Sequence, residues 1–462
     1  MTSRPNLLFV FTDQQTIGAL GLRQRSALSA AEGLGAAGNP HVATPRLDAL
    51  AASGVRFARS YCATPLCSPA RASLATGRFP SAHGVTTNHL HLPAGMPHLG
   101  GVLRAGGYET AWAGKWHVPE EYPLAEESIP GFVTLPLPGR QTDKNGYPVR
   151  LDGRPGNWDH NLGAYVDDPV AEVAADFLRR PHAKPFLLAV SLMNPHDICF
   201  PAAYARAGIP DESRLPPLPD NFAPPADEPE FLANTRWTHE GMCKPARDWN
   251  EHEWRVARWI YYRFTEMADR AVGIVLDALR RSELEEHTVV VFTSDHGEGG
   301  GAHRWLGKLS LYEEAIAVPF LVSRPGVIPP GVVDRERLVS AVDVLPTLCG
   351  YAGVEPPPGI AGIDLGPLIA NPALPGRPHV SVEMHPVWKG DTGAGRMLRT
   401  PRWKYARIAT GANPELLFDL DRDPGETRNL ARDPAARGEL DHHRTLLAAW
   451  LARSADPFPV RP

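Results

Sequence analysis

The sequence predicts an α/β fold in which a mostly parallel sheet is flanked by helices. Four short apolar runs each end in polar or ionisable residues, at 6–13, 108–117, 186–197 and 288–298. Uninterrupted runs of this length are typical of strands buried on both faces of a parallel sheet. Segments with helical periodicity fall between these strands, and such alternation is typical of an α/β domain.

The clearest helical pattern covers residues 253–281. Its apolar side chains recur at steps of three and four residues, which places them on one face of a helix. They are Ala257, Ile260, Phe264, Met267, Ala271, Val275 and Leu279. Shorter segments at 48–53, 170–179 and 342–351 also predict helices.

A short helix is predicted directly after Cys67, in the stretch PLCSPARASLATG. Ser68 suits the capping position, Pro69 suits the first helical position and Gly77 suits the end. The first turn of a helix has unpaired N–H groups and a partial positive charge, which together bind oxyanions. Arg71 adds a permanently charged, forked donor nearby. Cys67 is therefore expected to face an anion pocket.

Two Pro- and Gly-rich stretches, 118–168 and 198–250, lack clear periodicity and are predicted to be loops over the edge where the strands end. After about residue 375 the pattern changes to short strands and a closing helix. The strands are expected at 380–384, 396–399, 404–408 and 416–420, and the helix at 434–453. This order predicts a small antiparallel sheet with one helix packed on it.

Composition narrows the class of protein. The net charge of −5 over 462 residues argues against nucleic acid as the main partner. The five cysteines are odd in number and show no C-x-x-C spacing, which argues against a disulfide framework or a zinc knuckle and fits a reducing compartment. No signal peptide is recognised, and no apolar segment is long enough to cross a membrane. These features predict a cytoplasmic protein without a membrane partner.

Acidic residues follow two of the predicted strands at matching places. Asp13 follows NLLFVFT, and Asp295 follows TVVVFTS. Ligands of open α/β sheets bind beyond the carboxyl ends of the strands, so both side chains are expected at one edge. Two neighbouring carboxylates repel each other unless a cation lies between them, which predicts a divalent metal. His296 is a candidate third ligand and widens the choice from calcium toward manganese or other transition metals.

Cationic and proton-carrying side chains are expected at the same edge of the sheet. They are Lys115, His117, His196 and Lys308. Together with Arg71 and a metal, these groups predict a pocket for a tetrahedral oxyanion.

Several motifs occur together along the chain. The most specific is C-x-P-x-R at residues 67–71, followed by ASLATGRFPSAHGV. NLLFVFTDQ at the start, GKWH at 114–117, SDHGE at 294–298 and LLFDLDRDPGETRNL near the end accompany it. With these motifs the chain resembles, nearly from end to end, the type I sulfatases of the alkaline phosphatase superfamily.

The resemblance implies an alkaline phosphatase-like fold, in which a large mixed, mostly parallel sheet is flanked by helices. Residues 1–375 would form the catalytic domain and residues 376–462 a C-terminal α+β subdomain. It also implies that a formylglycine-generating or radical maturation enzyme oxidises Cys67 to formylglycine, an aldehyde. One hydroxyl of the hydrated aldehyde would attack sulfur and expel the alcohol, and deprotonation of the second would release sulfate.

The resemblance also implies a metal site. By position, Asp13, Asp295, His296 and residue 67 would bind the ion, with Ca²⁺ expected and Mn²⁺ as the alternative. Many sulfatases have two adjacent aspartates at the first position, whereas here Gln14 follows Asp13. An amide oxygen can coordinate a metal but brings no charge, so Gln14 is included among the predicted ligands.

The remaining site residues receive roles from the same resemblance. Arg71 would steady the formylglycine, and His117, assisted by Lys115, would be the base that deprotonates the hydrate. His196 and Lys308 would contact the sulfate and help to protonate the leaving oxygen. His83 is expected near the pocket without an assigned role.

Three functions remain open at this point. The leading hypothesis is hydrolysis of a small-molecule or saccharide sulfate ester. Tryptophans such as Trp116, Trp158, Trp305 and Trp388 are candidate stacking surfaces for a sugar, but each is expected first as a core or covering residue. The second is hydrolysis of phosphonate monoesters or phosphodiesters, which carry one negative charge as sulfate monoesters do. The third is a metal-binding protein without turnover, in which Cys67 stays a thiol. The sequence leaves the oligomeric state open.

Overall fold

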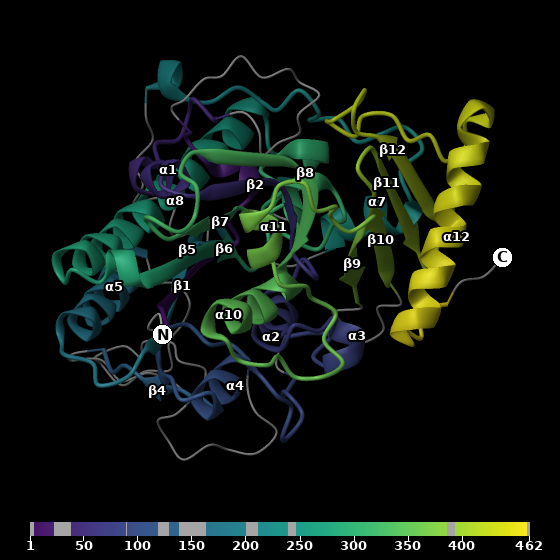
Figure 1. Cartoon of the computed structure of the whole chain (residues 1–462). Helices are drawn as coiled ribbons and strands as arrows, with labels where there is room; N and C mark the ends of the chain where they lie inside the picture. The colour runs from purple at the N-terminus through teal and green to yellow at the C-terminus, as the bar shows by residue number, and fades with distance from the viewer. Residues whose placement is uncertain are drawn as a thin grey trace.

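The computed structural model describes residues 4–22, 38–88, 90–118, 129–137, 163–199, 211–238, 246–385 and 393–459. Its centre is an eight-stranded sheet with the order β4-β3-β5-β1-β6-β7-β2-β8 (Figure 1). A four-stranded sheet with the order β12-β11-β10-β9 lies to one side of it. The predicted α/β fold with a smaller second sheet is therefore confirmed.

The four predicted strands lie next to one another in the large sheet. They are β3 (Glu109–Gly114), β5 (Phe186–Pro195), β1 (Asn6–Asp13) and β6 (Thr288–Ser294). Each neighbouring pair among them is parallel, so their carboxyl ends lie along one edge. The other strands are β4 (Val133–Thr134), β7 (Phe320–Ser323), β2 (Val55–Tyr61) and β8 (Val332–Ser340). The sheet is mixed because β7 runs antiparallel to both β6 and β2.

Helices cover both faces of this sheet, which explains the unbroken apolar character of its strands. One face, which includes Phe9 and Val291, packs against α2, α4, α10 and α11. The opposite face, which includes Val10 and Phe292, packs against α1, α5 and α8. The bounds are α1 (Pro45–Ala52), α2 (Cys67–Thr76), α4 (Leu99–Ala105), α5 (Gly163–Arg179), α8 (Glu251–Arg281), α10 (Val344–Ala352) and α11 (Gly366–Ala370).

Two local predictions are wrong. Helix α2 begins at Cys67, not after it, because Leu66 is the extended N-cap residue and its carbonyl accepts the N–H of Ala70. Ser68 is the second residue of the helix and therefore does not cap it. The N–H of Ser68 donates to Asn88 Oδ1 at 3.0 Å. The predicted end at Gly77 is correct, since this residue has the left-handed φ of 66° that favours glycine.

The two stretches predicted as loops also contain helices in the part that the structure describes. Helix α5 begins at Gly163, and the 198–250 stretch contains α7 (Glu230–Thr238). Helix α7 lacks a regular apolar period, but its Leu232 is fully buried against the core around Trp305. Packing rather than local pattern therefore determines this helix.

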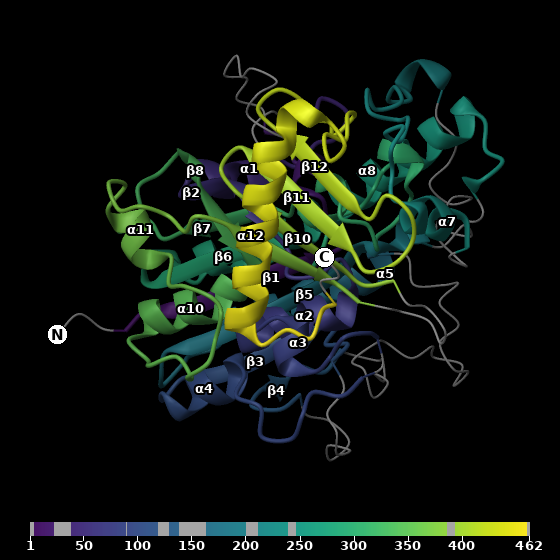
Figure 2. The ribbon, with the colours of Figure 1, turned by 90° about the vertical axis from the view of Figure 1, so that its right-hand side faces the viewer.

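The C-terminal sheet is antiparallel, as predicted. Its strands are β9 (Val380–Met384), β10 (Gly395–Arg399), β11 (Trp403–Ile408) and β12 (Glu415–Asp419). Helix α12 (Arg437–Ser454) lies across one face of the sheet (Figure 2). The other face packs on a core that includes Tyr61 and Tyr312 of the preceding part of the chain. The domain boundary at residue 375 stays a prediction.

A buried polar junction joins this sheet to the segment between β6 and β7. That segment contains the short helix α9 (Glu313–Ile316), and the N–H of Glu313 donates to Glu426 at 2.7 Å. The ammonium of Lys404 in β11 lies 2.7 Å from Glu426 and 3.2 Å from Glu313. Asn221 donates to Glu314 at 2.8 Å and to the carbonyl of Gly425 at 3.0 Å.

A second buried ion pair fixes the end of the chain to the C-terminal sheet. Arg396 in β10 donates from Nε and Nη2 to the two carboxylate oxygens of Asp456, at 2.5 and 2.9 Å, and both residues are buried. We expect Asp456→Ala to lower the free energy of unfolding by about 3–5 kcal/mol, because it leaves the guanidinium buried without its counter-charge. Urea unfolding measures this difference.

The matched control is Asp441→Ala, which removes a carboxylate from an exposed pair with Arg437 on α12. Its unfolding midpoint should stay close to that of the unmodified chain, because exposed pairs contribute little. If Asp456→Ala and Asp441→Ala lose the same free energy of unfolding, burial does not make the Asp456 ion pair more important than the exposed one.

The structure also bears on two of the sequence-based expectations, on membrane-spanning helices and on disulfide bonds. Among the described residues, no helix combines the length and apolar character needed to cross a membrane. The cysteines at 62, 67, 199 and 349 are free thiols, and Cys243 lies outside the described residues.

Candidate active site

The register of two strands brings the predicted carboxylates together. Thr12 in β1 pairs with Ser294 in β6, so Asp13 and Asp295 follow at neighbouring positions of the same sheet edge. The N–H of Asp295 donates to the carbonyl of Thr12 at 3.1 Å, which holds the two chain segments in this register. His296 is the next residue of the chain, and all three side chains are fully buried.

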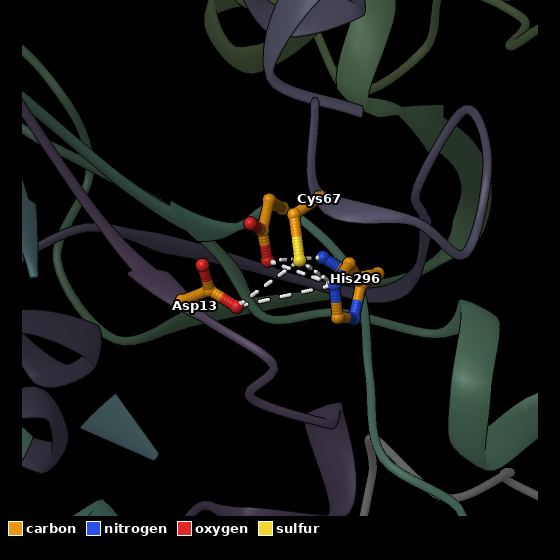
Figure 3. A group of neighbouring side chains, drawn as sticks. Asp13, Cys67 and His296 are labelled. Atoms are coloured by element: carbon orange, nitrogen blue, oxygen red, sulfur yellow. Dashed lines mark hydrogen bonds and ion pairs between the residues drawn. The ribbon is translucent and has the colours of Figure 1, made fainter. Parts of the chain in front are cut away.

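Helix α2 brings Cys67 to the same place. In Figure 3 the side chains of Asp13, Cys67 and His296 point toward one another. Cys67 Sγ lies 3.3 Å from His296 Nε2 and 3.8 Å from Asp13 Oδ1, and His296 Nε2 lies 3.7 Å from Asp295 Oδ1. The candidate ligand atoms of these four residues all lie within 4.8 Å of one another.

The donor set fits a divalent cation. His296 Nδ1 lies 3.0 Å from the carbonyl oxygen of Gly297, so Nδ1 carries a proton and Nε2 is the nitrogen that would bind an ion in the cluster. Asp13 Oδ1 and Asp295 Oδ1 lie 3.9 and 3.7 Å from His296 Nε2. Asp295 Oδ1 also accepts the N–H groups of Gln14 and His296, at 3.0 and 2.8 Å. Carboxylate oxygens and an imidazole nitrogen are both ligand types that divalent cations use in proteins.

Arg71 holds the outer oxygens of both carboxylates. Its Nη2 donates to Asp13 Oδ2 at 2.8 Å and its Nε donates to Asp295 Oδ2 at 2.9 Å. Nη1 donates to the carbonyl of Lys115 and to Ser191 Oγ, at 2.9 and 2.8 Å. The guanidinium therefore fixes the orientation of both carboxylates, which leaves their Oδ1 atoms directed at the cluster.

Two lysines place positive charge beside the cluster. Lys115 Nζ forms an ion pair with Asp13 Oδ2, and Lys308 Nζ lies 2.8 Å from Cys67 Sγ. Burial raises the pKa of Asp13, but Lys115, His196, Arg71 and Lys308 outweigh it and hold that pKa well below its ordinary value. Burial and Asp13 raise the pKa of the Cys67 thiol, yet Lys308, Lys115 and His296 bring it below the usual range.

The two remaining histidines lie in the electrostatic field of the same cluster. Burial holds the pKa values of His117 and His196 well below the ordinary value, with Lys115 lowering both and Asp13 opposing the shift. Both imidazoles are therefore neutral near pH 7 and can accept a proton. His117, three residues after the end of β3, has a left-handed φ of 59°, an uncommon conformation for a non-glycine residue.

Comparison with known proteins identifies the family of the chain. Residues 5–354 match the family model of the sulfatases. The chain belongs to the sulfatase family. Residues 301–448 also match the model for the C-terminal part of N-sulphoglucosamine sulphohydrolase. The predicted family is confirmed, and the chain is a hydrolase that acts on sulfuric ester bonds.

Three relatives illustrate the range of the likeness. Delta 4,5-hexuronate-2-O-sulfatase of Bacteroides thetaiotaomicron is 33% identical over 472 aligned residues, which cover 98% of this chain and 90% of the relative. The solved structure of a 2-O GAG sulfatase has a TM-score of 0.82 and 30% identity, covering 98% of this chain and 93% of that one. Phosphonate monoester hydrolase of Agrobacterium radiobacter has a TM-score of 0.77 and 25% identity, covering 98% and 96%.

Gln14 of this sulfatase has contacts that the sequence did not reveal. Its φ of 72° turns the chain after β1, and its Oε1 accepts from Lys308 Nζ at 3.0 Å. Its Nε2 donates to Glu298 at 2.6 Å and lies 3.2 Å from Cys199 Sγ. Metal binding by Gln14 stays a prediction.

Some residues near the sulfatase site were missed or placed differently. Glu298 ends the SDHGE motif, and no role is predicted for it from the sequence. Ser191 gave no sequence signal. His83 in α3 (Pro80–His83) contacts Ser73 Oγ at 3.0 Å and accepts the N–H of Val85 at 3.1 Å. These contacts place His83 in the packing behind α2.

Two of the candidate tryptophans are core residues, as expected for most of them. Trp116 is buried against Trp112, and Trp305 is buried while donating from Nε1 to the carbonyl of Lys308 at 2.7 Å. Neither of these indoles offers an exposed face for stacking on a sugar. Trp158 and Trp388 lie outside the described residues.

Proposed function

We propose that this sulfatase hydrolyses a sulfate ester on a saccharide. The observation that carries the proposal is the convergence of Asp13, Asp295 and His296 on Cys67, with Arg71 behind the carboxylates. The saccharide is supported by the relatives, since a hexuronate 2-O-sulfatase and a 2-O GAG sulfatase are among them.

The site has places for a cation and for a modified Cys67. We propose Ca²⁺ as the ion, with Mn²⁺ second, bound by Asp13, Asp295, His296 and residue 67; it would supply positive charge beside the nucleophile and the sulfate. Formylglycine at position 67 would supply a hydrate whose oxygen attacks sulfur and whose second hydroxyl allows release. The Sγ of Cys67 stands in for that nucleophilic oxygen in this structure.

The chain's own residues then have separable tasks. Lys308 Nζ, at 2.8 Å from Cys67 Sγ, holds positive charge at the point where a sulfate oxygen gains charge. The neutral His117 accepts a proton from residue 67, and the Lys115 ammonium favours the proton's removal. His196 contacts the sulfate, whose negative charge would raise the pKa of this imidazole so that it can help to protonate the leaving oxygen. Arg71 keeps the carboxylates oriented throughout.

A second candidate is hydrolysis of phosphonate monoesters or phosphodiesters. It is favoured by the likeness to phosphonate monoester hydrolase and by the Asp13-Gln14 start. Both substrate classes present a single negative charge to the same cations, so the site alone does not separate them.

Parallel assays separate the two functions. We expect kcat/KM for a 2-O-sulfated unsaturated uronate disaccharide to exceed that for a phenylphosphonate monoester or a phosphate diester by about tenfold or more. The protein is first shown by mass spectrometry to carry the aldehyde at residue 67, with Cys67→Ala as the blank. A larger kcat/KM for either phosphorus ester would overturn the sulfate assignment.

A further inference from the structure

Glu298 is a buried carboxylate just behind the predicted site. It follows β6 by four residues and is 1% exposed. Its Oε1 accepts the N–H groups of Gly300 and Gly307, at 3.0 and 2.6 Å. Its Oε2 accepts from Gln14 Nε2 at 2.6 Å. Three N–H donors match the ionised form of the carboxylate.

Glu298 and Lys308 determine which way the Gln14 amide points, because the third neighbour, Cys199 Sγ, lies near both ends of the amide, 3.2 Å from Nε2 and 3.4 Å from Oε1. An ionised Glu298 only accepts hydrogen bonds, so it must face the NH₂ group of Gln14. The Lys308 ammonium only donates, so it must face the Gln14 oxygen, from which it lies 3.0 Å. The same ammonium lies 2.8 Å from Cys67 Sγ. A continuous chain of polar contacts thus runs from Glu298 through Gln14 and Lys308 to residue 67.

We propose that Glu298 is a positioning residue for hydrolysis. It fixes the Gln14 amide with the oxygen toward Lys308, and this oxygen holds the ammonium on residue 67. The role in catalysis rests on the proposed function, because Lys308 there stabilises the reacting sulfate. The competing explanation is that Glu298 only shapes the glycine-rich turn through its bonds to Gly300 and Gly307.

Exchanging the donor and the acceptor of the hydrogen bond between Gln14 and Glu298 separates these two explanations. In Glu298→Gln, the new amide keeps its oxygen on the two glycine N–H groups and presents NH₂ to Gln14. Gln14 must then rotate and turn its own NH₂ group toward the Lys308 ammonium. We expect kcat to fall about 10- to 100-fold, with a smaller change in KM, because a hydrogen bond to a charged group is replaced by a repulsive contact.

The partner variant Gln14→Glu places a second carboxylate against Glu298 and should lower kcat by a similar factor. The double variant Gln14→Glu/Glu298→Gln again pairs one amide with one carboxylate at positions 14 and 298, and its net charge is that of the unmodified chain. The amide introduced at position 298 would donate to one oxygen of the carboxylate introduced at position 14, and the other oxygen would accept from Lys308. We expect both kcat and the unfolding midpoint of the double variant to exceed those of both single variants.

Thermal unfolding provides a readout that does not need turnover, and aldehyde and metal content are measured in every variant. Glu383→Gln is the matched control, since Glu383 is buried and accepts from Ser81 at 2.8 Å. In the double variant Gln14→Glu/Glu383→Gln, the decrease in unfolding midpoint should equal the sum of the decreases in the two single variants. If the losses of kcat and of unfolding midpoint in Gln14→Glu and Glu298→Gln add up in the double variant, the positioning role of Glu298 is overturned. If the unmodified chain cleaves no ester, the proposed function fails instead, and the midpoints alone decide whether Glu298 orients Gln14.

Discussion

Cys67→Ala is expected to reduce turnover of every ester substrate by about 10⁴-fold or more, because it removes the nucleophile on which the other groups converge. The fold should persist, since a smaller side chain at the start of α2 disturbs neither the Leu66 carbonyl bond to Ala70 nor the Arg71 contacts with the two aspartates. Initial rates and the thermal midpoint measure the two effects.

The matched control is Cys349→Ala, which removes another buried thiol from α10 in the core between the helices and the large sheet. Its kcat should stay near that of the unmodified enzyme. Mass spectrometry of the peptide that contains residue 67 completes the test. A Cys67→Ala enzyme with a near-normal rate, or an unmodified thiol in fully active protein, would remove formylglycine from the mechanism.

His117→Ala is expected to lower kcat by about 10²- to 10⁴-fold, because the neutral imidazole is the proposed base. Metal content should be nearly unchanged, since the clustered ligand atoms belong to Asp13, Cys67, Asp295 and His296. Burial and the neighbouring cations hold the pKa of His117 well below its ordinary value, so this imidazole already carries a lone pair at neutral pH. Steady-state rates and elemental analysis of the same preparations check both statements.

His182→Gln is a suitable control for this second experiment. His182 contacts Glu109 at 3.0 Å, at the amino end of β3 and therefore away from the site. Its substitution should leave kcat unchanged. If His117→Ala loses metal in proportion to its lost activity, then His117 is a ligand and another group must act as the base.

The position of the site was predictable because it follows from strand ends. Asp13 and Asp295 each come directly after an apolar run, and parallel pairing of these runs places the two residues together. The local sequence was therefore enough to predict where the two carboxylates lie. The same holds for α8, whose Asn250 and Glu253 form a capping box at the start of a strongly periodic segment.

Other features depend on contacts between distant residues and could not be predicted. The orientation of the Gln14 amide is imposed by Glu298 and Lys308, which lie 284 and 294 residues away in the chain. The start of α2 depends on Asn88, which binds the N–H of Ser68. In both cases the local sequence allows several arrangements, and tertiary contacts select one.

The junction of Lys404 and Glu426 with Glu313 means that the large sheet alone is an incomplete enzyme. Every residue of the reaction centre precedes residue 375, yet the segment that carries Lys308 is anchored by side chains that follow it. Removal of the residues after 375, by proteolysis or premature termination, should therefore abolish hydrolysis. All the proposed reacting groups would still be present, but the segment that carries Lys308 would lose its contacts with Lys404 and Glu426.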